Sequence, residues 1–263
     1  MIPITAIPIS SDEIFTLFQK FITGEAVDGK SVDKFENELG RYVGSKKVFS
    51  FNAGRTALYV GLQALGLKAG DEIIVPAYTC AIVFEAVLRL GLKPLLVDVN
   101  PETCNIDPER ITNVMSQRTK AIVAVHLFGC PCEMDAVADV SREHGLYLIE
   151  DVAQALGAEY QGKKAGSFGD LAMFSFGPGK CLTGGEGGAL AANNESLINP
   201  IAKIHAELPN PNWKWVLHVM RNIVAMKTFS NSWLYPLARA QVEESVRNTD
   251  DMIVQNCLTL LKS

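Results

Sequence analysis

The sequence predicts a three-layer α/β/α sandwich built on a mostly parallel β-sheet. Short apolar segments alternate with amphipathic helical segments between residues 72 and 150. The apolar segments are rich in β-branched residues and carry few polar ones, which is typical of strands buried on both faces of a sheet. Repetition of strand, helix and strand at this spacing implies right-handed crossovers between parallel strands.

Each element follows from its own local pattern. The first helix is expected after the good capping residues Ser10, Ser11 and Asp12. The last two strands flank a glycine-rich loop with no helix between them, which favours a hairpin-like pair joined to the parallel sheet. The expected helices span 11–22, 32–43, 56–65, 81–90, 108–115, 134–144 and 194–206. The expected strands span 47–51, 72–75, 94–97, 120–125, 146–150, 171–176 and 188–192.

A break in the chain is expected near residue 209, where Pro and Asn alternate through Asn212. A chain of 263 residues can form one large core or two modest domains. Beyond the break the sequence reads as helical and rich in Leu, Val and Met. We therefore predict a large α/β domain over residues 1–208 and a helical C-terminal segment over 209–263.

Composition excludes several classes of function. With 48% hydrophobic and 20% charged residues the chain is expected to fold as a globular protein. The net charge of -5 gives no basic footprint for nucleic acid. An integral membrane span needs about 20 apolar residues, and basic residues interrupt the nearest candidate, 213–240. That stretch is expected to be an amphipathic helical region, and a membrane-surface or partner-binding helix is the alternative.

The cysteines and the first residues indicate the compartment. Residues 1–20 lack the basic start and apolar core of a signal peptide. The six cysteines are irregularly spaced, and the pair Cys130 and Cys132 does not have the spacing of a zinc or redox motif. We therefore expect a cytoplasmic protein with free thiols and no metal site.

The loop from Asn52 to Thr56 lies between an expected strand and an expected helix. Gly54 would let backbone N–H groups approach an anion closely, and a helix N-terminus favours negative charge. The Thr56 hydroxyl could add a donor. Taken alone, the loop fits either a structural turn or a phosphate site.

Two further loops follow expected strands. Glu150 and Asp151 end an apolar strand, so Asp151 is either part of a solvated turn or helix cap, or a buried carboxylate that keeps a heterocyclic nitrogen protonated. Lys180 stands among the glycines of segments 175–180 and 183–188. Such a lysine is either an ordinary loop residue or a desolvated nucleophile for carbonyls. Because carboxyl ends of parallel strands share one sheet edge, all three loops could form one site.

The chain resembles the DegT-like nucleotide-sugar aminotransferases, a branch of the fold-type I pyridoxal-phosphate (PLP) enzymes. The resemblance covers residues from about 32 to 197. Its specificity comes from many matches in the correct order. The matching segments are 70–76, 97–98, 105–107, 119–122, 126–129, Asp151 with Gln154, 166–170, 174–176, Lys180 and 184–188.

The resemblance implies roles for the matching residues. Lys180 would form the Schiff base with PLP and shuttle a proton, and Asp151 would keep the pyridine nitrogen protonated so that the ring acts as an electron sink. Gln154 would hydrogen-bond near the ring hydroxyl. The cofactor phosphate would be held by Gly54, Arg55 and Ser175, with Thr56 as a helper. The implied protein is a homodimer that moves an amino group, typically from glutamate, to a keto-sugar carried on a nucleotide.

Three departures from the family pattern matter. Arg55 stands where many members have threonine, and its guanidinium could bind phosphate bidentately. Cys80 occupies the position of a ring-stacking aromatic, so Tyr78 or another residue would have to cover the ring. The chain also ends at Ser263, about a hundred residues before the usual end of the family, so residues 209–263 would form an incomplete small domain.

Two other functions are compatible with these residues. A PLP-binding relative without transaminase activity could serve a structural or regulatory partner. Sugar dehydration is a third hypothesis, but the resemblance places histidine at the Schiff-base position of that branch, and Lys180 counts against it. Two further residues are assigned more simply. His126 is expected to be structural, and Glu186 either faces substrate or caps its turn.

Overall fold

The computed structural model describes residues 10–25, 29–209 and 212–229, together with residues 252, 255 and 259. Its described helices are α1 (Ser11–Ile22), α2 (Lys30–Val43), α3 (Gly54–Ala64), α4 (Ala81–Arg89), α5 (Pro108–Val114), α6 (Met134–His144), α7 (Glu195–Ala206) and α8 (Trp213–Phe229), with a 3₁₀ turn, η2 (Leu127–Gly129). Its strands are β1 (Lys47–Phe51), β2 (Glu72–Pro76), β3 (Lys93–Val97), β4 (Thr119–Val125), β5 (Tyr147–Asp151), β6 (Glu159–Tyr160), β7 (Lys163–Lys164), β8 (Leu171–Ser175) and β9 (Gly188–Ala192).

Seven strands form one sheet in the order β1-β9-β8-β5-β4-β2-β3. The pairs β2/β3, β2/β4, β4/β5 and β5/β8 are parallel, whereas β9 is antiparallel to both β1 and β8. The expected hairpin-like pair is therefore β8 and β9, and the mostly parallel sheet is confirmed. The small hairpin of β6 and β7 was missed, because two-residue strands carry no periodic signal.

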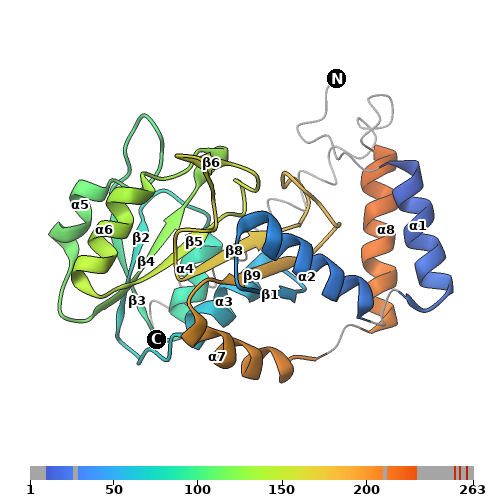
Figure 1. Cartoon of the computed structure of the whole chain (residues 1–263), viewed down its shortest axis with the longest axis horizontal. Coiled ribbons are helices and arrows are strands. Elements are labelled where there is room, and N and C mark those ends of the chain that lie inside the picture. Colours follow the sequence, from blue (N-terminus) through green and yellow to red (C-terminus); the bar gives the residue numbers. More distant parts are fainter. Residues whose placement is uncertain are drawn as a thin grey trace.

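Helices cover both faces of the sheet and complete the three layers (Figure 1). Side chains of α3, α4 and α7 pack in one core with alternate strand residues such as Ile73, Val123 and Ile149. The opposite face, which includes Ile122 and Leu148, packs against α2 and α6 in two further cores. Alternation along strands that are buried on both faces explains why the strands read as continuous apolar runs.

Capping residues set several helix boundaries as the sequence predicts. Ser10 caps α1 in a capping box with Glu13, in which each side chain accepts the other residue's backbone N–H. Asp107 and Asn194 accept backbone N–H bonds in the same way at α5 and α7. The predicted boundaries agree with the structure to within two residues at nearly every element.

The helix α8 lies beside α1 at one end of the molecule (Figure 1). Val219 and Ile223 of α8 pack with Ile14 and Leu17 of α1. No described helix is long and apolar enough to cross a membrane. Residues 230–240 of the expected amphipathic region lie outside the described residues, as does most of the segment 209–263, so the boundary near 209 stays a prediction.

Candidate cofactor site

The loops that follow β1, β5 and β8 meet at one edge of the sheet, because these strands run in the same direction. Gly54 lies directly against Ser175. A Cβ atom placed on Gly54 would lie 2.9 Å from the Cβ of Ser175 and 3.2 Å from its Oγ. Gly188 allows a second close approach, since its Cβ would lie 2.4 Å from the backbone N of Gly54. Glycine is therefore required for the N-terminus of α3 to reach the Ser175 hydroxyl.

This N-terminus is suited to an anion. Ala53 is the N-cap of α3 and provides no side-chain acceptor for the first turn. The N–H groups of Gly54 and Arg55 therefore have no side-chain cap and lie at the positive end of the helix dipole, and Gly54 lies against Ser175. These features fit the phosphate of a cofactor.

Asp151 lies at the carboxyl end of β5 and is 5% exposed. Its Oδ1 accepts the backbone N–H of Ala153 at 2.9 Å, the one hydrogen bond to this side chain among the described residues. Burial raises the pKa of Asp151, whereas the Ala153 N–H and the charge of Lys180 act to lower it. A buried carboxylate of this kind remains ionised most readily beside a cationic partner, and a protonated pyridine nitrogen is such a partner.

Lys180 lies half-buried in the loop that follows β8. Its backbone N–H donates to the carbonyl of Gly177 at 3.3 Å, and Gly179 between them has a φ of 77°, which favours glycine. The Lys180 charge is close enough to lower the pKa of Asp151. The structure thus brings the predicted lysine within electrostatic range of the predicted carboxylate.

Gln154 connects two loops around the site. Its side-chain Oε1 accepts the backbone N–H of Phe128 at 2.8 Å, and its backbone carbonyl accepts the thiol of Cys181 at 3.3 Å. The side-chain NH₂ group has no hydrogen-bond acceptor among the described residues, and it could donate to a cofactor hydroxyl. Gln154 therefore connects the loop after β4 to the loop that carries Lys180.

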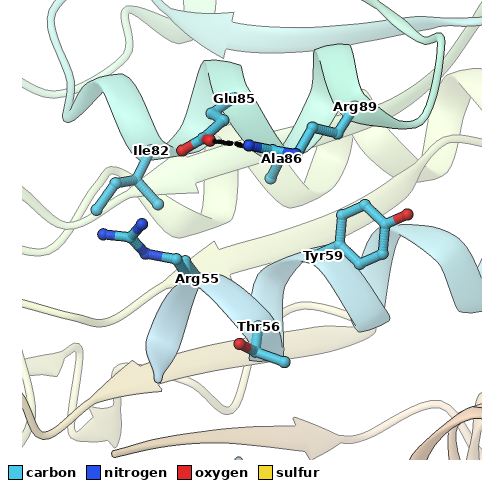
Figure 2. A pocket seen from close by; sticks show the side chains of 7 residues that line it. All are labelled: Arg55, Thr56, Tyr59, Ile82, Glu85, Ala86 and Arg89. Carbon is cyan, nitrogen blue, oxygen red and sulfur yellow. Dashed lines mark hydrogen bonds and ion pairs between the residues drawn. The ribbon is translucent and has the colours of Figure 1, made fainter. Parts of the chain in front are cut away.

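The side chains of Arg55 and Thr56 were expected to face the cofactor phosphate, but in the structure they contact other groups. The Thr56 hydroxyl donates to Oδ1 of Asn52 at 2.8 Å, so its proton is already used. Arg55 is exposed and points toward α4 (Figure 2). It borders a recess of about 460 Å³ between α3 and α4. The recess is lined by Arg55, Thr56, Tyr59, Ile82, Glu85, Ala86 and Arg89. The first-turn N–H groups, more than these two side chains, provide the cradle for an anion.

A buried polar network that the sequence did not reveal lies next to Asp151. Glu150 and His126 are both fully buried, and Nε2 of His126 lies 3.0 Å from Oε2 of Glu150. Glu150 also accepts three backbone N–H bonds at 2.7 to 2.8 Å, from Gly166, Phe168 and Gly169. Nδ1 of His126 accepts the N–H of Cys132 at 3.0 Å, which places the imidazole proton on Nε2. His126 is thus structural, as expected.

Helix α8 packs on the glycine-rich loop after Lys180. A Cβ on Gly185 would lie 2.5 Å from Cγ1 of Ile223, so this glycine allows the helix to approach. Glu186 lies 3.7 Å from Nε2 of His218 on α8. Glu186 therefore lies near a histidine of α8, a contact that neither of the two sequence interpretations included. Among the described residues, no cluster of His, Cys, Asp and Glu could hold a metal ion.

Comparison with known proteins identifies this arrangement. Residues 9–223 match the DegT/DnrJ/EryC1/StrS aminotransferase family. The chain belongs to this family. GDP-perosamine synthase from Caulobacter vibrioides is 41% identical over 187 residues, which are 71% of this chain and 50% of that protein. The chain spans about half the length of the curated relatives it matches.

Solved structures of aminotransferases have the same fold. The aminotransferase from Psychrobacter cryohalolentis superimposes with a TM-score of 0.73 at 32% identity, covering 86% of this chain and 64% of that one. NtdA from Bacillus subtilis, solved with bound cofactor PMP, gives 0.70 at 29% identity, covering 84% and 54%. The DegT family is PLP-dependent, and relatives of this chain include sugar aminotransferases that act on nucleotide-sugars. The phosphate cradle and the buried Asp151 of this chain fit that cofactor.

Proposed function

We propose that this chain binds PLP and transfers an amino group from an amino acid, most simply glutamate, to a keto-sugar carried on a nucleotide. The observation that supports this proposal is the meeting of Lys180, Asp151 and the Gly54–Ser175 cradle at one sheet edge. A loop lysine near a buried carboxylate, beside an anion cradle, is what a phosphorylated pyridine aldehyde requires. The family and its relatives support the same assignment.

Each residue has a proposed task. PLP, when bound, supplies the electron sink that weakens bonds to the amino-bearing carbon. Asp151 holds a proton on the pyridine nitrogen by charge pairing, and the Lys180 amine binds the cofactor and later moves a proton at the substrate carbon. Ser175 and the N–H groups of Gly54 and Arg55 hold the phosphate, and Gln154 donates to the ring hydroxyl. The donor leaves as a keto acid, and the acceptor becomes an amino-sugar.

Three wider proposals accompany this one. We propose a homodimer, which the apolar exposed side chains of Phe15, Phe18 and Ile22 on α1 support. We propose a reducing, cytoplasmic compartment, which the five free cysteines among the described residues support. We also propose that residues 1–208 are the cofactor-binding unit, since the three site loops lie within them. Light scattering of the purified protein tests the first of these.

The test of the main proposal follows the visible absorbance of the cofactor. Protein with PLP should show a visible band that L-glutamate removes, and a nucleotide-linked keto-sugar should restore it while an amino-sugar forms. A panel that includes GDP-4-keto-6-deoxymannose covers the acceptor. A band without amino transfer to any member of the panel would favour the alternative, a PLP-binding protein with a structural or regulatory role. No band at all would overturn both.

A further inference from the structure

Phe128 has a backbone conformation that its residue type disfavours. Its φ is 55° and its ψ is 22°, inside the left-handed region. A bulky non-glycine residue there is a conformational outlier that costs free energy. Burial does not offset this cost, because Phe128 is 69% exposed. An exposed side chain that is kept in an unfavourable conformation points to a role outside folding.

The surrounding loop holds Phe128 in place. Its backbone N–H donates to Oε1 of Gln154 at 2.8 Å. The residue before it, Leu127, is buried and donates its N–H to Oδ1 of Asn105 at 3.0 Å. Cys130 closes the turn by donating to the carbonyl of Leu127 at 2.9 Å. The loop is therefore fixed on both sides, and the phenyl ring projects outward at the edge of the sheet where the site lies.

A second exposed aromatic residue lies beside it. Tyr78 is 53% exposed, and its ring centroid lies 6.3 Å from that of Phe128 with the planes tilted by 50°. Tyr78 follows β2 and Phe128 follows β4, and these strands are neighbours in the sheet. Cys80, two residues after Tyr78, is exposed and is the N-cap of α4. The aromatic surface at this edge is thus provided by Tyr78 and Phe128.

We infer that Phe128 and Tyr78 form a wall against which the sugar ring of the acceptor packs. This inference rests on the proposed function. Gln154 places the wall next to the site, since it bonds Phe128 and lies three residues after Asp151. The wall carries no charge, so it offers little to an amino acid with carboxylates. An uncharged ring with apolar C–H groups gains from being buried against aromatic side chains.

Two variants of Phe128 test the wall. Phe128→Leu removes the ring and should raise the KM for the nucleotide-linked keto-sugar by roughly tenfold. The rate at which L-glutamate removes the visible band should stay within about twofold of the wild-type rate, because the amino donor does not contact the wall. Trp213→Leu is the control, because Trp213 at the start of α8 is also exposed, at 60%, and it should change neither the acceptor KM nor the rate with L-glutamate. Phe128→Asn should weaken the acceptor equally without lowering the thermal unfolding temperature, because asparagine tolerates the left-handed conformation.

The outcomes separate this inference from the proposed function. An unchanged acceptor KM in Phe128→Leu would overturn the wall, as would equal slowing of both half-reactions. The wall would also be overturned if Phe128→Leu changed only the oligomeric state, because the phenyl ring of Phe128 would then contact a second copy of the chain and not the sugar. Should the wild type fail to react with L-glutamate, the proposed function fails. Calorimetric titration with GDP-perosamine then tests the wall independently. The wild type should bind GDP-perosamine, and Phe128→Leu should bind it more weakly. Absence of binding by wild type would overturn the wall.

Discussion

The two faces of the sheet at the end of β5 each bury a carboxylate, and their surroundings are opposite. Glu150 points to one face and receives four hydrogen-bond donors, three from the backbone of residues 166–169 and one from His126. Asp151 points to the other face and receives one donor from the part of the chain that the structure describes, the N–H of Ala153. Glu150 thus has its hydrogen-bond donors within the chain, whereas we propose that Asp151 gains a further donor from the bound cofactor. Satisfied buried charge organises the fold, and incompletely satisfied charge marks the site.

The largest effect on the free energy of unfolding is expected for Glu150, the carboxylate with four hydrogen-bond donors. Glu150→Ala would leave three buried N–H groups and His126 without their acceptor, so the free energy of unfolding should fall by about 3–5 kcal/mol. Urea denaturation measures the change. A loss below about 1 kcal/mol would show that the loop at 166–169 does not depend on Glu150 and that this carboxylate does not organise the fold.

The next effect concerns the anion cradle. Ser175→Ala removes a hydroxyl that is proposed to donate to the cofactor phosphate, and a hydrogen bond to a charged group contributes about 1.5–3 kcal/mol. PLP affinity, measured by titration of the visible band, should fall at least about tenfold. Ser167→Ala is the control, because that hydroxyl donates to the carbonyl of Lys164 outside the cradle. Equal loss in both variants would contradict the assignment of Ser175.

A smaller effect with the opposite sign is expected for Asp151→Asn. Burial raises the pKa of Asp151, so its ionised form costs stability in the protein without cofactor. This cost begins as the pH rises above the ordinary carboxyl pKa of about 3.9 and is complete above the pKa in the folded state. The variant should therefore unfold a few degrees higher than wild type at pH 7, about 1 kcal/mol, and lose that advantage at acidic pH.

Thermal melts of both proteins without cofactor, taken between pH 4 and pH 8, measure this difference. With PLP the order should reverse, because only wild type pairs the pyridine nitrogen. Were Asp151→Asn less stable than wild type at every pH, Asp151 would be a structural residue like Glu150.

The smallest effect is expected where α8 meets the glycine-rich loop. His218 and Glu186 are 47% and 34% exposed at their side chains and lie 3.7 Å apart, so solvent screens their interaction. His218→Gln should change the free energy of unfolding by less than about 0.5 kcal/mol and leave PLP affinity unchanged. Weaker PLP binding in this variant would show that α8 controls the position of Lys180.

Much of this arrangement could be predicted from the sequence. The strand ends at Phe51, Asp151 and Ser175 follow from apolar runs that end in polar or glycine-rich loops, and the direction of the strands brings those loops together. The partners of Glu150 could not be predicted, because its donors are backbone groups 16 to 19 residues away that carry no signature of their own. The left-handed conformation of Phe128 was also hidden, since phenylalanine rarely adopts it.

We propose that PLP is held on Lys180. Borohydride reduction of the protein with PLP, followed by peptide mapping, locates the lysine that carries the cofactor. One pyridoxyl group is expected on Lys180 in wild type and in Phe128→Leu, and none in Lys180→Ala. A pyridoxyl group on another lysine, or none in the wild type, would show that Lys180 does not bind PLP.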